Sequence, residues 1–404
     1  MLSRGKSIAC LLLLLLHLII AFMWTVSATA ITTYNVVNFG AMPDGESNNN
    51  VTAEAFLTAW AVACNSTGPT SIYVPPGIYM IGTPIRFNGQ SCKSDSITIL
   101  IHGTLVAPPA DLGRSWILFE RVNRLSIYGG TIDAQGSWLW ACKASKNDSC
   151  HSSGSTSSSL EFSHSKNVIV RGLTSLNSQL THIVIFGCNN FKLHGLKVSA
   201  PGNSPNTDGI HISYSSNITV LNSNIGTGDD CISVGPKTDS LWIENIACGP
   251  GHGISIGSLG GKIEVGGVKN VTVRTAKFTG TENGVRIKTW AEEGKGLVRD
   301  VVFEHITMLN VQNPIVIDQK YCPGHNCPNQ SSGIEISDVT YQDIHGTSSR
   351  EVAVRFDCSD ENPCSRIILQ DIDLMYGEKM AQSSCSNVDG TASGVVVPSS
   401  CLSS

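Results

Sequence analysis

The chain has 404 residues and a net charge of −5 at pH 7, and only 15% of its residues are charged. Its basic residues are scattered rather than clustered, which argues against a nucleic-acid-binding surface. Glycine is frequent, with 39 residues, and long amphipathic helical stretches are nearly absent, so the composition favours an all-β protein.

The first 30 residues have the pattern of a secretory signal peptide. Arg4 and Lys6 precede an apolar run over residues 8–22, and Ala28-Thr29-Ala30 offers small residues for cleavage. A retained membrane anchor is the alternative, because the run is almost long enough to span a bilayer. Cleavage would leave 25 basic and 32 acidic residues, a net charge of −7. We expect residues 31–404 to form one secreted domain with no membrane attachment.

One helix is predicted, over residues 52–64. Its apolar residues recur at spacings of three and four, as on one face of a helix. Stacked-repeat proteins need a cover on their terminal repeat. We therefore expect this short N-terminal helix to cap the open end of the fold.

Beyond this helix, short segments with alternating apolar residues recur at steps of roughly 22 to 33 residues. Such steps are too short for a strand, a helix and a return, but they suit a coil of several short strands, which is a parallel β-helix. A β-sandwich is the alternative, but it does not explain why charged motifs recur at the strand period. The segments begin at Leu125, Asn167, Asn190, Asn217, Leu241, Asn270, Asp300, Gly333 and Arg366.

Four polar motifs recur with this period. Asp208 precedes Asp230 by 22 residues, Asp230 precedes His252 by 22, and His252 precedes Arg286 by 34. In a coil stack, residues one period apart become neighbours. The motifs therefore predict one site that contains three acids, a histidine and two cations. They are Asn206-Thr207-Asp208-Gly209, Gly228-Asp229-Asp230-Cys231, Gly251-His252-Gly253 and Arg286-Ile287-Lys288.

These residue types suit the cleavage of a glycosidic bond. Inverting hydrolysis needs a protonated carboxyl that donates to the leaving oxygen and a carboxylate that activates water. Crowding of the three aspartates raises at least one pKa, so a proton stays available. Asp229 and Asp230 are adjacent and would face opposite sides of an ideal strand. We therefore expect a distorted strand or turn there, which Gly226-Thr227-Gly228 makes feasible.

The four motifs, together with Gly130-Thr131-Ile132-Asp133-Ala134-Gln135-Gly136 and the segment Cys248 to Gly260, resemble the plant polygalacturonases of glycoside hydrolase family 28. The resemblance covers nearly the whole mature chain. It implies a right-handed parallel β-helix that hydrolyses α-1,4 bonds between galacturonic acid units of pectin. It also implies inversion at the anomeric carbon, with no metal and no cofactor.

The resemblance further implies roles for the catalytic residues. Asp229 is the general acid, while Asp208 and Asp230 hold and deprotonate the water. His252 is expected to make a hydrogen bond that sustains the protonation of the acid; the alternative is a structural histidine in a turn.

Five more residues are expected to bind the substrate. Arg286 and Lys288 lie on one strand face, where they would bind the uronate carboxylate; the alternative is a solvated pair at a strand edge. Tyr321 matches a family position beside the cleaved bond. Asn206 is expected to orient the turn of Asp208, and His182 to lie near the cleft, but either could be purely structural.

The cysteines agree with export, because 13 of the 14 lie in the mature chain. A zinc site is disfavoured, since the paired Cys-x-x-Cys spacing does not occur. Cys188 is left over as a buried thiol. The expected disulfides are Cys64–Cys92, Cys142–Cys150, Cys231–Cys248, Cys322–Cys327, Cys358–Cys364 and Cys385–Cys401. Candidate glycosylation sites are Asn50, Asn65, Asn147, Asn217, Asn270 and Asn329.

Three other functions compete with this interpretation. A hydrolase of rhamnogalacturonan or substituted galacturonan is the nearest. A pectate lyase would use an Arg base and calcium, and a non-catalytic pectin-binding protein would not need three mutually repelling aspartates. We expect a monomer in the cell wall that acts on polygalacturonic acid; the sequence leaves endo or exo attack open.

Overall fold

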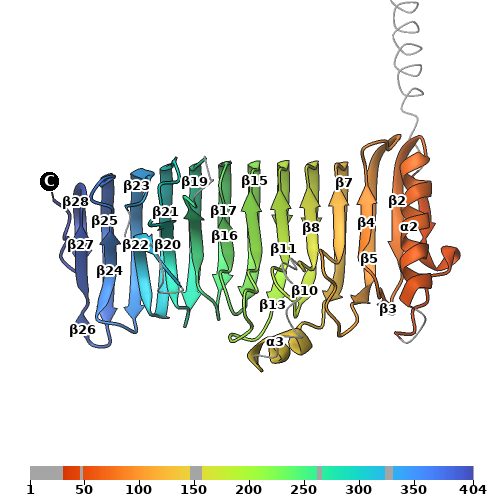
Figure 1. The fold of residues 1–404 in the computed structure, drawn as a ribbon, viewed down its shortest axis with the longest axis horizontal. Coiled ribbons are helices and arrows are strands. Elements are labelled where there is room, and N and C mark those ends of the chain that lie inside the picture. The colour runs from red at the N-terminus through yellow and green to blue at the C-terminus, as the bar shows by residue number, and fades with distance from the viewer. Residues whose placement is uncertain (1–30, 46–48, 146–156, 262–265, 324–330, 404) are drawn as a thin grey trace, which may run out of the picture.

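The computed structural model describes residues 31–45, 49–145, 157–261, 266–323 and 331–403, and these form a right-handed parallel β-helix. The coils follow one another along the long axis of the molecule, from the N-terminal helix to the C-terminal strands (Figure 1). The expected signal peptide, residues 1–30, lies outside the described residues.

Each coil contributes strands to two sheets, which we call the front sheet and the back sheet. Among the described strands, all pairings are parallel apart from the pair β25–β26. The front sheet contains β4 (Ile85–Asn88), β6 (Ile117–Glu120), β8 (Leu160–Ser163), β11 (Ile183–Phe186), β14 (Ile210–Ser213), β16 (Ile232–Val234), β18 (Ile254–Leu259), β20 (Asn283–Trp290), β22 (Asn313–Tyr321), β24 (Val352–Asp357) and β27 (Gln382–Ser386).

The back sheet is built largely from longer strands that bend at the corners of the coils. Its strands are β1 (Thr32–Asn35), β2 (Gly68–Val74), β3 (Ile78–Met80), β5 (Ser94–Val106), β7 (Asn123–Asp133), β9 (Lys166–Arg171), β10 (Thr174–Leu176), β12 (Asn189–His194), β13 (Lys197–Ser199), β15 (Ser216–Gly226), β17 (Thr238–Cys248), β19 (Val268–Thr279), β21 (Gly296–Val311), β23 (Ile334–Ser348), β25 (Cys364–Tyr376), β26 (Lys379–Met380) and β28 (Val388–Val397).

The core is a set of apolar columns that run along the axis. Ile210, Ile232 and Ile254 pair directly with one another across β14, β16 and β18, and all are buried. Alternate residues on these strands face outward, because successive side chains of a strand point to opposite faces. The period seen in the sequence therefore fixes two things together, the buried column and the outward row.

Corner residues keep the coils in register. Asn167, Asn190 and Asn217 hold left-handed backbone conformations, with φ of 55°, 53° and 56°. Asparagine tolerates this region better than most residues. Their side chains form a ladder, because the Nδ2 of Asn190 donates to the Oδ1 of Asn167 at 2.7 Å and the Nδ2 of Asn217 donates to the Oδ1 of Asn190 at 3.4 Å.

Two α-helices and one 3-10 helix, η1 (Val36–Phe39), accompany the coils in the described part of the chain. Helix α2 (Asn49–Asn65) contains the predicted segment 52–64 and covers the N-terminal end of the stack (Figure 1). Its Trp60 ring packs 5.2 Å from the ring of Phe87, measured between centroids. Helix α3 (Ser137–Ala144) was not predicted.

No helix within the described ranges is long and apolar enough to cross a membrane.

The structure contains four of the expected disulfides, Cys64–Cys92, Cys231–Cys248, Cys358–Cys364 and Cys385–Cys401. Cys142 and Cys322 are also disulfide-bonded, while their expected partners Cys150 and Cys327 lie outside the described residues. Cys188 is a buried free thiol, as expected. Of the six candidate glycosylation sites, Asn50, Asn65, Asn217 and Asn270 are exposed, and Asn147 and Asn329 lie outside the described residues.

Candidate active site

The expected catalytic segments precede three neighbouring strands of the front sheet. Asp208, Asp230 and His252 each lie two residues before a strand, and those strands pair in register. Arg286 is shifted along its strand, because it pairs with Ser255 rather than with His252. Lys288 follows two residues later on the same face of β20.

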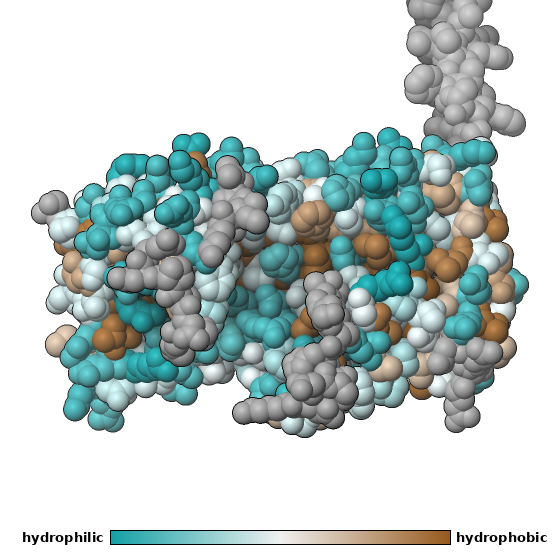
Figure 2. All heavy atoms as spheres, in the orientation of Figure 1, coloured by the Kyte–Doolittle hydropathy of each residue, from teal (hydrophilic) through white to brown (hydrophobic). Residues whose placement is uncertain are grey.

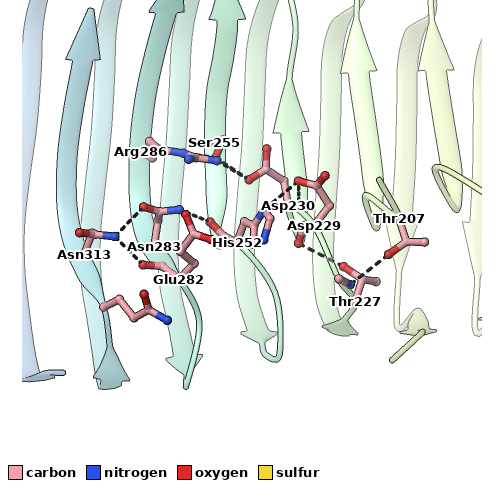
Figure 3. Close-up of polar contacts among 12 residues, drawn as sticks. Thr207, Thr227, Asp229, Asp230, His252, Ser255, Glu282, Asn283, Arg286 and Asn313 are labelled. Atoms are coloured by element: carbon pink, nitrogen blue, oxygen red, sulfur yellow. Dashed lines mark hydrogen bonds and ion pairs between the residues drawn. The ribbon is translucent and has the colours of Figure 1, made fainter. Parts of the chain in front are cut away.

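Asp229 and Asp230 lie in a bend between β15 and β16, which is the distortion that the sequence required. The bend lets both carboxyls reach the site from adjacent positions (Figure 3). The Oδ1 of Asp229 accepts a hydrogen bond of 2.8 Å from the backbone N–H of Asp230. The carboxyl of Asp229 then contacts His252, and that of Asp230 contacts the cations of β20.

Asp230 is buried, and both of its oxygens have partners. Lys288 Nζ lies 2.8 Å from Oδ2, while Arg286 Nη2 lies 3.0 Å from Oδ1. The hydroxyl of Ser255 also donates to Oδ1, at 2.7 Å, and receives a hydrogen bond of 3.1 Å from Arg286 Nε. The two cations that we expected to bind a substrate carboxylate are thus already paired with the carboxylate of Asp230.

Asp208 is the carboxyl that retains a proton. Burial, followed by the negative charges of Asp229 and Asp230, raises the pKa of Asp208 to about 7. The hydroxyl of Ser233 donates to its Oδ2 at 2.6 Å. The same hydroxyl lies 2.9 Å from Nδ1 of His211, whose pKa is lowered by burial.

Asp229 faces His252, whose Nδ1 lies 3.0 Å from Oδ1 of the carboxyl. Burial acts to raise the pKa of Asp229, but the hydrogen bond and the charge of His252 outweigh it, so this pKa is lowered. The pKa of His252 is raised, chiefly by its hydrogen bond to Asp229 and with help from Glu282, whose Oε2 lies 3.4 Å from Nε2. We expected His252 to sustain the protonation of the acid; in the free protein this contact favours the ionised form of Asp229.

Tyr321 ends β22 beside the cations. Its ring centroid lies 5.1 Å from Lys288 Nζ and 5.9 Å from the guanidinium carbon of Arg286. Asn206 is exposed and holds a left-handed turn with φ of 57°, which suits its expected role in orienting the turn of Asp208.

His182 does not reach the cleft surface. Its side chain is fully buried, its Nδ1 lies 2.9 Å from the hydroxyl of Ser175, and burial lowers its pKa to about 3. Its backbone N–H donates to the carbonyl of Asp208. It therefore supports the acid from beneath, and the expectation that it binds substrate is wrong for this structure.

Comparison with known proteins identifies the family of this site. Residues 64–401 match the family model described as glycosyl hydrolases family 28. The chain belongs to this family. It is therefore a glycoside hydrolase, and the resemblance seen in the sequence is confirmed.

Three similar proteins agree. A polygalacturonase of Prunus persica is 53% identical over 96% of this chain and 98% of its own. An exopolygalacturonase of Platanus acerifolia is 40% identical over 91% of this chain and 97% of its own. An endo-xylogalacturonan hydrolase from Aspergillus tubingensis has a solved structure that superposes with a TM-score of 0.77, at 24% identity, over 90% of this chain and all of the other; it supports the fold.

One group of donors at this family site has the spacing of a cation site. Single ligand atoms of Asp229, Asp230 and His252 lie within 4.8 Å of one another. Because Arg286 and Lys288 already neutralise Asp230, a divalent cation would have to displace one of them or share a carboxylate with them. The donor set therefore fits the two organic cations better than a metal ion.

Sequence reasoning missed four polar residues of the site, Ser233, Ser255, His211 and Glu282. Three of them carried a signal, since His211, Ser233 and Ser255 follow the motif positions at the same 22-residue step. Glu282 carried none, because it precedes β20 in a longer coil.

Proposed function

We propose that this protein is a secreted polygalacturonase of the plant cell wall that hydrolyses α-1,4 bonds between galacturonic acid units by inversion. The observation that supports this most is the cationic pair Arg286 and Lys288 beside three aspartates. A neutral polysaccharide would not need these cations, whereas a uronate carboxylate would. The plant relatives named above carry the same activity in their names.

The cations can bind substrate although they already contact Asp230. Arginine has five N–H donors and lysine three. Of these, Arg286 donates from Nε and Nη2 to Ser255 and Asp230, and Lys288 contacts Asp230 through its single amine. The remaining donors are available to a uronate at this position. Tyr321, beside both cations, would form one wall of this subsite.

The protonation of the side chains in the site supports acid and base catalysis. The charges of Asp229 and Asp230 act with burial to raise the pKa of Asp208 to about 7, so Asp208 holds a proton below about pH 7. The hydrogen bond to Asp229 raises the pKa of His252, which favours a second proton next to that carboxyl. In the proposed reaction Asp229 receives a proton from this cluster and donates it to the leaving oxygen. Asp208, once ionised, and Asp230 hold the attacking water and accept its proton.

The closest competing function is hydrolysis of a substituted galacturonan, because such a substrate offers the same carboxylates to Arg286 and Lys288. A lyase would instead require a metal at the Asp229, Asp230 and His252 donors. The contacts of the cations with Asp230 disfavour that role.

The deciding experiment is product analysis of the secreted protein on polygalacturonic acid with a chelator present. New reducing ends without unsaturated uronides would establish hydrolysis. Release of monomer alone would indicate exo attack, and a ladder of oligomers endo attack. Unsaturated products that vanish with chelator would contradict the proposal, as would absence of any product.

A further inference from the structure

The outward residues of the front sheet form one continuous row through the active site and a second row on either side of it. On the C-terminal side of the acids the first row contains Arg286 and Arg355, and the second contains Lys288, Asp318 and Asp357. On the N-terminal side the first row continues through His211, Val184, Glu161 and Leu118 to Arg86. The second row continues through Ser213, Phe186, Ser163, Glu120 and Asn88.

Before Arg86, the N-terminal rows contain apolar and acidic residues together with His211 and the uncharged polar residues Ser213, Ser163 and Asn88. The first cation along them is Arg86, four strands beyond β14, and it pairs with Glu120. Glu161 accepts a hydrogen bond from Ser115, and no Lys or Arg of the described residues forms an ion pair with it. Lys237 stands outside the rows, over the ring of Tyr214. Two cations, Arg286 and Lys288, thus lie next to the acids on the C-terminal side, whereas the N-terminal rows contain no cation before Arg86.

We call the part of these rows on β8, β11 and β14 the N-terminal arm, and it borders a hollow in the surface. The hollow has a volume of about 470 Å³, and its lining includes Glu161, Leu180, Val184, Phe186 and His211. Figure 2 shows apolar residues gathered on this face toward the N-terminal coils, beside a hydrophilic and hollowed centre. The ring of Phe186 lies 5.1 Å from that of Tyr214, which is 44% exposed, so an aromatic pair borders the hollow.

We propose that this N-terminal arm binds methyl-esterified galacturonosyl units, while the unit at Arg286 and Lys288 carries a free carboxylate. The inference rests on the proposed function. A free carboxylate over Val184 and Phe186 would lose water, find no cation on the rows beneath it and approach the carboxyl of Glu161, all of which are unfavourable. Lys237, at the border of the hollow, already contacts the ring of Tyr214. A methyl ester has no charge, and its methyl group gains by leaving water against these apolar side chains. The enzyme would then cut where esterified and free stretches of one chain meet.

The test uses the full secreted protein with two substrates, fully de-esterified polygalacturonate and the same polymer re-esterified to an intermediate degree. Mass spectrometry then locates the methyl esters relative to the new chain ends. We expect esters next to the cut on one side only, with free carboxylates on the other. Esters excluded equally from both sides would overturn the inference while leaving the proposed function intact. No cleavage of either substrate would overturn both.

Two variants sharpen the result. Val184→Lys supplies a cation to the arm, and should change the ratio of kcat/KM on the two substrates about three- to tenfold toward the de-esterified one, as expected for one charge contact. Glu161→Gln should change it in the same direction by less. The matched control is Ile169→Lys, on the exposed side of β9 in the back sheet. Unchanged ratios in both arm variants would overturn the inference.

Discussion

Lys288 and Asp230 form an ion pair of 2.8 Å in which the lysine side chain is 9% exposed and the aspartate 2%. With Arg286 on the other oxygen, the carboxylate is held by two cations. If these cations also bind the uronate, as we propose, the pair joins substrate binding to the stability of the site. Removing one partner should show both effects.

Lys288→Ala should raise KM, because a donor to the uronate is lost, and should also destabilise the protein. A buried carboxylate that loses its partner costs about 3 kcal/mol. Chemical denaturation at pH 7 measures the loss. The control is Lys320→Ala, which removes an exposed pair with Asp357 and should cost less than about 1 kcal/mol. A loss for Lys288→Ala no larger than that for Lys320→Ala would contradict this account.

Asp229→Asn should abolish proton donation to the leaving oxygen. General acid catalysis contributes about 10²- to 10⁴-fold, so kcat should fall by that range while oligogalacturonate binding stays near normal. Steady-state kinetics and calorimetry check the two parts. Asp373→Asn, an exposed acid on β25, serves as the control. A near-native rate in Asp229→Asn would remove this residue from the mechanism.

Asp208 should make stability fall as pH rises from about 4 to about 7. Its folded-state pKa is about 7 against a usual value of 3.8, so in this window the folded protein retains a proton that the unfolded chain has released. Charging the buried carboxyl then costs folding free energy, about 3 kcal/mol across the window. Asp208→Asn should flatten this part of the profile, measured as denaturation midpoints at several pH values. A variant whose profile parallels that of the unmodified protein would argue against a protonated Asp208.

His252→Gln should move the alkaline limb of the kcat/KM profile to higher pH. The histidine lowers the pKa of Asp229, so its removal raises that pKa and lets the acid keep its proton longer. The maximal rate should fall, because the second proton next to Asp229 is lost. His305→Gln, which removes an exposed histidine paired with Asp343, should leave the profile in place. A limb that moved to lower pH would show that His252 sustains protonation after all.

The sequence predicted the coil stack because one residue type recurs where one backbone geometry recurs. Asn167, Asn190 and Asn217 mark left-handed corners, and the apolar residues after each mark a strand. The capping helix was visible for the same reason, as a periodic apolar face. Helix α3 was not, since its eight residues carry no side-chain cap and too few turns to show a period.

The sequence predicted the acids of the site, but not which residues contact each of them. The 22-residue step placed Asp208, Asp230 and His252 in one column. The pairing of Arg286 with Ser255 depends on a longer coil between β18 and β20, so sequence spacing gave no register for it. Which carboxyl keeps the proton depends on burial and on contacts such as Ser233 with Asp208, which only the assembled coils define.

Each coil adds one position to each outward row, so the length of the rows depends on the number of coils. A whole coil inserted between β16 and β18 would move Asp230 away from His252 by about 4.8 Å, the spacing of neighbouring strands, and would end catalysis. A coil inserted between β4 and β8 would leave the arrangement of the acids unchanged and lengthen the stretch of polysaccharide that the protein can contact. Evolution can therefore change the length of polysaccharide that the protein contacts without changing the residues that cleave the glycosidic bond.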